Sequence, residues 1–280
     1  MDLGGIVVDV EPHYDVIALC VGLVLAYVGA IVRYGTLFHP APGDRAVTTK
    51  QAVSFGGGVL ALWVASGSPL HDIAETTLYS AHMVQHLLQA FVIPPLLLLG
   101  IPRWMGELIL RPRWVRGPLK VVSQPLVAAL FFNLVLLLIH WPAIVNGMIA
   151  SELFHGITHI VLVVAATAMW IPMVSPVPDI LPRLQPLAQM LYLFTMTILP
   201  TVPSAFLTFG EEPLFRVYEE LPRAYGLTAA EDMRIAGLIM KIGGGFFLWG
   251  IIATMFFRWA ADQERQEQAQ RREAAATGAR

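Results

Sequence analysis

Two pairs of histidines in this sequence have the spacing of a metal site. His82 and His86 lie in the apolar stretch YSAHMVQHLLQAFVIPPLLLLG, and His155 and His159 lie in ELFHGITHIVLVVAATAMWIP. A spacing of four residues places both imidazoles of a pair on one face of a helix, close enough to bind one ion. A fifth histidine, His140, ends another apolar run. Ionisable side chains are costly in hydrocarbon and usually have a function there, so the pattern predicts a metal site inside a membrane-embedded helical bundle.

Two further residues extend the polar face of each histidine pair. Tyr79 and Glu152 each stand three residues before a pair, and Glu152 could serve as a carboxylate ligand or orient an imidazole. Imidazole suits Cu, Zn, Fe and Ni, and Cu(II) has the highest affinity of the divalent ions. The single cysteine, Cys20, excludes a thiolate pair, so a Cu(I) site would use histidine and methionine.

The remaining polar residues of the apolar stretches have plainer interpretations. His13 and His71 fall near water, where a structural role is favoured over a metal ligand. Gln85 and Gln89 are expected to be polar packing contacts. Lys241, in AGLIMKIGGG, is costly in a membrane and is expected to pair with an acidic residue or to extend towards the membrane surface.

Composition places the chain among all-α polytopic membrane proteins. Of its 280 residues 56% are hydrophobic and 14% are charged, whereas a soluble domain has about a quarter charged. The net charge of −2 gives no indication of nucleic-acid binding, because the basic residues lie in short loops and form no stripe, so we expect the lipid bilayer and no nucleic acid as a partner. We predict one bundle of seven transmembrane helices over residues 1–260, followed by a charged, disordered cytoplasmic tail over 261–280. The predicted spans are 15–34, 49–66, 76–100, 123–141, 153–174, 186–208 and 234–259.

The distribution of basic residues predicts the orientation of these spans. Of the 18 Lys and Arg residues, fourteen fall in loops or the tail on one side, and only Arg216, Arg223 and Arg234 fall on the other. The positive-inside rule therefore places the C-terminus in the cytoplasm and the N-terminus outside. This orientation puts the five intramembrane histidines in the extracytoplasmic half of the bilayer, with only His39 on the cytoplasmic side.

Several sequence blocks resemble the CtaG family associated with caa3-type cytochrome c oxidases. They are HMVQHLLQAFVIPPLLLLGIP, HWPAIVNGMIASELFHGITHIVLVVAATAMWIPMVSP, LPTVPSAFLTFGEEPLF and EDMRIAGLIMKIGGG. The likeness runs in order from about residue 50 to 257, and H-M-x-x-H…P-P is its most specific part. The resemblance implies a seven-span protein of the bacterial plasma membrane that assembles haem-copper oxidases. It makes the five intramembrane histidines candidates for copper, matches Asp232 to an acidic position opening the last span, and puts Lys241 where many relatives have an aromatic residue.

The leading hypothesis is therefore a copper-binding assembly factor rather than an enzyme. It would accept copper from an extracytoplasmic donor and deliver it to the CuB centre of an oxidase subunit. A haem-b redox protein is the first alternative, because two histidines on facing spans could be axial ligands. A copper permease is the second, and it would need further ligands in the cytoplasmic half.

Overall fold

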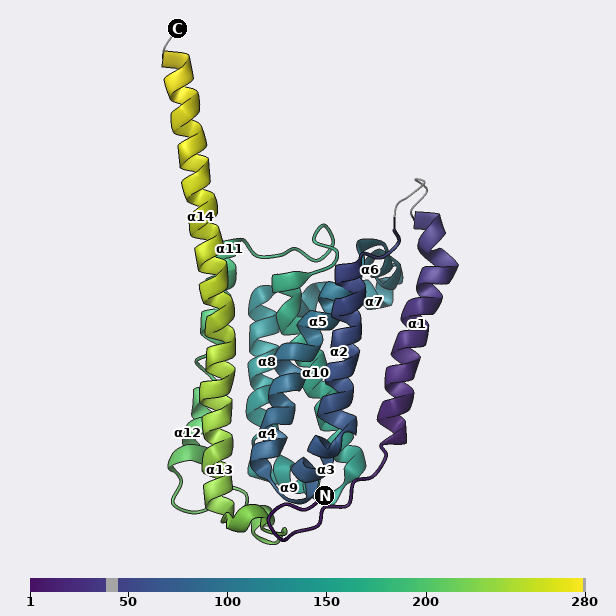
Figure 1. Ribbon diagram of the computed structural model, residues 1–280, viewed down its shortest axis with the longest axis vertical. Coiled ribbons are helices and arrows are strands. Elements are labelled where there is room, and N and C mark those ends of the chain that lie inside the picture. The colour runs from purple at the N-terminus through teal and green to yellow at the C-terminus, as the bar shows by residue number, and fades with distance from the viewer. Residues whose placement is uncertain (39–44, 279–280) are drawn as a thin grey trace.

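The computed structural model describes residues 1–38 and 45–278, so His39 lies outside the described residues. The described chain is all-α, without a β-strand. Most helices run along one common axis, and the N-terminus lies at the end of the bundle opposite to the C-terminus (Figure 1).

Six helical segments in the described residues are long and apolar enough to cross a bilayer. A seventh is present if α7 and α8, which meet at a bend of 82°, are one span. The segments are α1 (Tyr14–Phe38), α2 with α3 (Thr49–Gly67, Pro69–Thr76), α4 with η1 and α5 (Tyr79–Leu87, Leu88–Val92, Ile93–Gly100), α7 with α8 (Arg113–Val122, Pro125–Ile139), α10 (Glu152–Val174), α11 with α12 (Pro186–Met196, Thr201–Phe209), and α13 with η4 and α14 (Ala229–Leu238, Ile239–Gly243, Gly244–Gly278). The connections contain α6 (Arg103–Ile109), α9 (Pro142–Ala150), η2 (Arg216–Glu219) and η3 (Ala224–Gly226). The chain is thus an all-α polytopic membrane protein, as predicted.

The fourth span is shorter than predicted. α8 has 15 residues, about 22 Å at 1.5 Å per residue, against a hydrocarbon core of about 30 Å. The break comes at Gln124, whose backbone is extended because Pro125 follows it. α7, which carries basic residues and the exposed Trp114, turns away from α8 as an amphipathic helix, the kind that lies along a membrane surface.

Two spans contain a π-helical turn near the histidine cluster. The first is η1, directly before Pro94 and Pro95, where the sequence predicts a kink. The second is η4, around Lys241. A π-helical turn inserts a residue into the helix and re-aims the side chains on either side of it, and such turns are frequent at functional sites.

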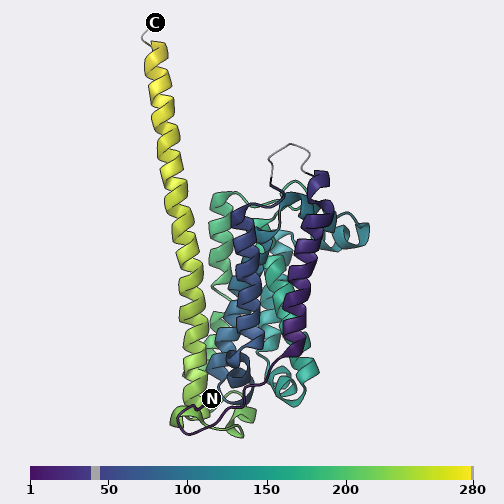
Figure 2. The same cartoon turned by 45° about the vertical axis from the view of Figure 1, so that its right-hand side comes forward.

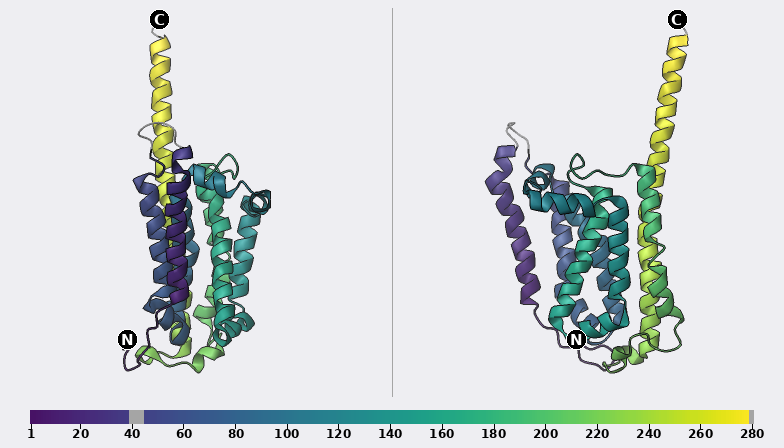
Figure 3. Two further views of the ribbon diagram at one scale, coloured as in Figure 1. Left: turned by 90° about the vertical axis from the view of Figure 1, so that its right-hand side faces the viewer. Right: turned by 180° about the vertical axis from the view of Figure 1, so that it is seen from behind.

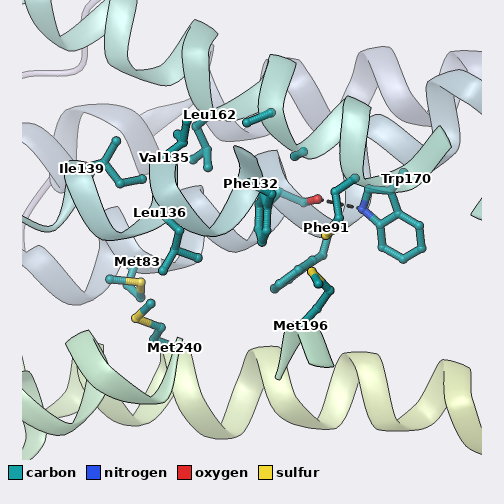
Figure 4. Close-up of a cluster of buried hydrophobic side chains, with 14 of the residues drawn as sticks. Met83, Phe91, Phe132, Val135, Leu136, Ile139, Leu162, Trp170, Met196 and Met240 are labelled. Carbon is teal, nitrogen blue, oxygen red and sulfur yellow. Dashed lines mark hydrogen bonds between the residues drawn. The ribbon is translucent and has the colours of Figure 1, made fainter. Parts of the chain in front are cut away.

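The core lies between α4, α8 and α10, with α14 alongside (Figures 2 and 3). Trp170 of α10 donates a hydrogen bond of 2.9 Å from Nε1 to the carbonyl oxygen of Ala90 in η1, beside Phe91 and Phe132 (Figure 4). α2 and α5 approach closely at Gly58, where a Cβ atom would lie 2.8 Å from Leu97. The absence of a side chain at Gly58 thus permits the close approach of these two helices.

The C-terminal region differs from the predicted disordered tail. α14 continues as one helix to Gly278 and projects beyond the bundle (Figure 1). Its distal part is rich in Ala, Gln, Glu and Arg, which favour helix, and ion pairs join Arg265 to Asp262 and Arg271 to Glu267 along it.

Candidate metal centre

The fold brings all five predicted histidines into one buried cluster. The rings of each helical pair are in contact, with centroids 4.2 Å apart for His82 and His86, which are tilted to each other, and 4.3 Å apart for His155 and His159, which meet edge-on. The two pairs face each other: the ring centroid of His82 lies 5.3 Å from that of His155 and 5.5 Å from that of His159. His140, the C-cap of α8, completes the cluster 5.9 Å from His86. All five are buried.

Three of these imidazoles converge most closely. His82, His155 and His159 each offer one ring nitrogen, and these atoms all lie within 4.8 Å of one another. Bonds of about 2 Å place two ligands of one ion at most about 4 Å apart. Small rotations of the rings are therefore enough to bring three nitrogens onto one ion.

Glu75 orients His155 for binding. Its Oε1 lies 2.8 Å from Nδ1 of His155, and a carboxylate can only accept a hydrogen bond. Nδ1 therefore carries the proton, and Nε2 keeps its lone pair. That lone pair faces Nε2 of His159 at 3.0 Å. The carboxylate–histidine pair has the form in which metal-binding histidines are usually held.

His159 is held from its other side by Gln89. The Gln89 side-chain amide lies 3.1 Å from Nδ1 of His159 and 3.2 Å from Oγ of Ser66. Since the oxygen and nitrogen of an amide can exchange places by a flip, Gln89 can accept from a protonated Nδ1 as well as donate to a bare one. It can therefore support His159 both when Nε2 carries the proton and when Nε2 binds a metal.

His140 is oriented by its own helix. Its Nδ1 donates to the carbonyl oxygen of Leu136 over 2.7 Å, so Nε2 keeps a lone pair and has no hydrogen-bond partner among the described residues. His86 and His140 line a small cavity with the thioethers of Met196 and Met240. Figure 4 shows Met240 next to Met83, a residue of α4.

The observation that best indicates a metal-binding role is the lack of hydrogen-bond partners at His82 and His86. Within the described part of the chain, both ring nitrogens of each residue are buried without a hydrogen-bond partner. A buried polar group left without a partner costs about 1–3 kcal/mol. His82 belongs to the group of three convergent nitrogens, and His86 adds a further imidazole beside it, so this donor set fits a metal ion that prefers imidazole, such as copper.

Tyr79 and Asp232 shape the start of α4. Asp232 accepts hydrogen bonds from the backbone N–H groups of Tyr79 and Ser80, at 2.6 and 3.1 Å. The Tyr79 ring stacks on His82, with centroids 5.6 Å apart. Tyr218 packs against Tyr79, and burial, followed by the charges of Asp232 and Glu75, raises the pKa of Tyr218 far above its usual value. Asp232 therefore acts by capping the helix that carries His82.

The structure also places two of the accessory candidates, Glu152 and Lys241. Glu152 is the first residue of α10, and its side chain is exposed. The carboxylate that contacts His155 is that of Glu75. Lys241 does not meet an acidic partner in the described chain: its ammonium donates to the carbonyl oxygen of Thr197 and the hydroxyl of Thr201. The freed carbonyls at the break between α11 and α12 provide this site.

His71 and Glu75 were missed as functional residues. Their segment lies between two predicted spans, and it forms α3, with Ser68 as N-cap and Pro69 in the first turn. Their spacing of four residues was the available signal, together with this start motif. Nε2 of His71 lies 3.1 Å from Glu75, and Gln85 contacts Nδ1 of His71 at 2.7 Å, so His71 belongs to the cluster's polar network.

One comparison with known proteins gives a family. The sequence profile described as cytochrome c oxidase caa3 assembly factor (Caa3_CtaG) matches residues 25–262. Neither the curated proteins nor the solved structures include a significant match.

Proposed function

The chain belongs to the cytochrome c oxidase caa3 assembly-factor family, and on this premise we propose that it binds copper within the membrane and delivers it to the CuB centre of a haem-copper oxidase. The observation that carries the proposal is the convergence of His82, His155 and His159, with nitrogens within 4.8 Å of one another. Both nitrogens of His82 lack a partner among the described residues, which supports an ion as the intended partner.

The chemistry of the donors favours copper as the cargo. Imidazole binds copper well, and the thioethers of Met196 and Met240 beside His86 and His140 suit Cu(I). Cys20 packs between α1 and α2, where its thiol faces the carbonyl oxygen of Val59, so it adds nothing to the site. Transfer would proceed by exchange of one imidazole for another, and the protein would act as an assembly factor and not as a catalyst.

We infer that transfer to a partner takes place at the extracytoplasmic end of the bundle. His82 and His86 lie on α4, and His155 and His159 lie near the start of α10. Figure 1 shows α4 at the end of the bundle that carries the N-terminus, and the distribution of basic residues supports the extracytoplasmic side for that end. We place the protein in the bacterial plasma membrane, with an oxidase subunit as its partner and an extracytoplasmic protein as its copper donor.

The two alternatives gain less support. A haem held between two histidines would need space for its large flat ring. The imidazole rings of the cluster contact one another, and the adjoining cavity has a volume of only about 40 Å³. A permease would need donors in both halves of the membrane. All seven histidines of the described chain belong to one connected group at one end.

Metal analysis of the detergent-purified protein tests the proposal. After loading with copper(I) and removal of free metal, the wild type should retain about one copper per chain, and the double variant His155→Ala/His159→Ala should retain almost none. Glu152→Gln, exposed on the same helix, is the matched control and should behave as the wild type. Wild type that retains no copper, or a folded double variant that retains as much as the wild type, would overturn the proposal. An absorption spectrum checks the haem alternative, since reduced low-spin haem has sharp visible bands.

A further inference from the structure

A chain of imidazoles and carboxylates leads from the buried cluster towards water. Glu75 connects the two regions: its Oε1 contacts Nδ1 of His155 at 2.8 Å and Nε2 of His71 at 3.1 Å. The side chains of His71 and Glu75 are 14% and 27% exposed, whereas that of His155 is 5% exposed. His155 of α10 is therefore the most deeply buried of the three, and Glu75 and His71 of α3 are more accessible to solvent.

The outer end of this chain is formed by His13 and Asp72. Nε2 of His13 lies 3.1 Å from Oδ1 of Asp72, and the His13 ring stands edge-on to that of His71, with centroids 4.6 Å apart. The His13 side chain is 20% exposed, and that of Asp72 is only 7% exposed. The second carboxylate oxygen of Asp72 is buried without a partner among the described residues, which is costly for a charged group.

We propose that His13, His71 and Asp72 form an outer metal-loading site, from which copper passes by way of Glu75 to the histidine cluster. The inference rests on the proposed copper function and assigns these residues to it. Asp72 offers its partnerless oxygen and His13 its imidazole at the border with water. Both ring nitrogens of His71 already have partners, Gln85 and Glu75, so His71 would bind the ion by giving up its contact with Glu75. Ligand exchange then moves the ion inward, one metal–ligand bond forming as another breaks.

The donors of the outer site are expected to bind copper more weakly than those of the inner cluster. Carboxylate oxygen is a hard ligand that suits Mg, Ca and Mn, while imidazole suits copper. A mixed set therefore holds copper more weakly than the all-imidazole set of His82, His155 and His159. An ion bound first at the outer site would consequently move inward, towards the stronger ligands.

The N-terminal segment is built to hold His13 in place. Leu3 and Val8 are buried against Ala224 of the connection before α13, and the backbone N–H of Tyr225 donates to the carbonyl oxygen of Leu3. The N-terminal ammonium also donates to the carbonyl oxygen of Val8, at 2.8 Å. His13 precedes residue 25, where the family match begins. The outer site therefore joins a residue outside the matched region to two inside it.

The rate of copper loading tests this inference. The full-length protein in detergent is mixed in a stopped-flow instrument with copper(I) bound to a chromophoric chelator, and release from the chelator is followed. His13→Ala and Asp72→Asn should lower the loading rate about tenfold, the lower end of the effects seen on changing residues that support metal ligands. The final copper content should stay at the wild-type value. Glu11→Gln, an exposed carboxylate near His13, is the control and should load at the wild-type rate.

The outcomes separate this inference from the proposed function. Wild type that takes up no copper overturns both. Wild type that fills, with both variants filling at the same rate, overturns the loading site alone. If Asp72→Asn does not fold, the loading rate of His13→Ala is the test, because the His13 ring is partly exposed and its removal is expected to leave the fold intact. A second measurement uses His155→Ala/His159→Ala, which should still bind copper(I) weakly and lose that binding when His13→Ala is added; weak binding that persists contradicts the inference.

Discussion

The carboxylate of Asp232 caps the first turn of α4 at Tyr79, with its Oδ2 2.6 Å from the backbone nitrogen of Tyr79. The two residues are 153 positions apart in the chain, and Asp232 itself is buried in the first turn of α13. The negative charge sits at the positive end of the α4 dipole. This contact fixes where the helix begins, and therefore the height of His82, three residues later.

Removal of this cap should destabilise the protein. Asp232→Ala leaves the buried N–H groups of Tyr79 and Ser80 without acceptors, so we expect a loss of about 1–3 kcal/mol in the free energy of unfolding. Thermal unfolding in detergent, followed by circular dichroism, measures it. Glu211→Gln, an exposed carboxylate of the outer connection, should unfold as the wild type does. Equal stability of Asp232→Ala and wild type would show that the cap is not needed.

Loss of the Glu75 charge should weaken copper binding. Glu75→Gln keeps the size of the side chain but makes the group opposite His155 neutral, which lowers the basicity of the imidazole. The dissociation constant for copper should rise about 10- to 100-fold, as for other residues that support metal ligands. Competition titration against a chelator measures this. Glu152→Gln is the control, and the opposite ranking of these two variants would refute the assignment of Glu75.

The five histidines should not contribute equally. His155 belongs to the group of three nitrogens within 4.8 Å, whereas His140 reaches the cluster only through His86. We expect His155→Ala to lose most of its copper and His140→Ala to retain most of it, measured as copper per chain by mass spectrometry. An equal loss in both variants would indicate a single site centred on His86 instead.

Lys241 and Thr201 should be energetically coupled. Because Lys241 donates to Thr201 across the contact between η4 and α12, Lys241→Met and Thr201→Val remove one shared interaction. A double-mutant cycle should give a coupling energy of about 0.6 kcal/mol, the average for hydrogen bonds between membrane helices. Copper content should not change. Strict additivity of the two single effects would exclude the contact.

Local patterns in the sequence were sufficient for the parts of the site that lie on one helix. The spacing of four residues in each histidine pair brought the rings 4.2–4.3 Å apart, because helix geometry depends only on neighbours in the chain. The apolar runs likewise predicted the membrane spans, since each span must satisfy its own backbone hydrogen bonds in lipid. The class of protein and the candidate ligands followed from these two local rules.

Contacts between helices could not be predicted from such local rules. The choice of Glu75 over Glu152 as the partner of His155 depended on how α3 packs against α10, and the role of Asp232 depended on the position of α13 beside α4. The same packing places His13 against His71, and His71 within hydrogen-bond distance of Gln85, in the polar network beside the histidine cluster. The sequence by itself determined the spans, the paired histidines and the class of chemistry, because these depend on period and hydrophobicity. Only the tertiary structure decided which carboxylates serve them, because it alone sets the distances between residues far apart in the chain.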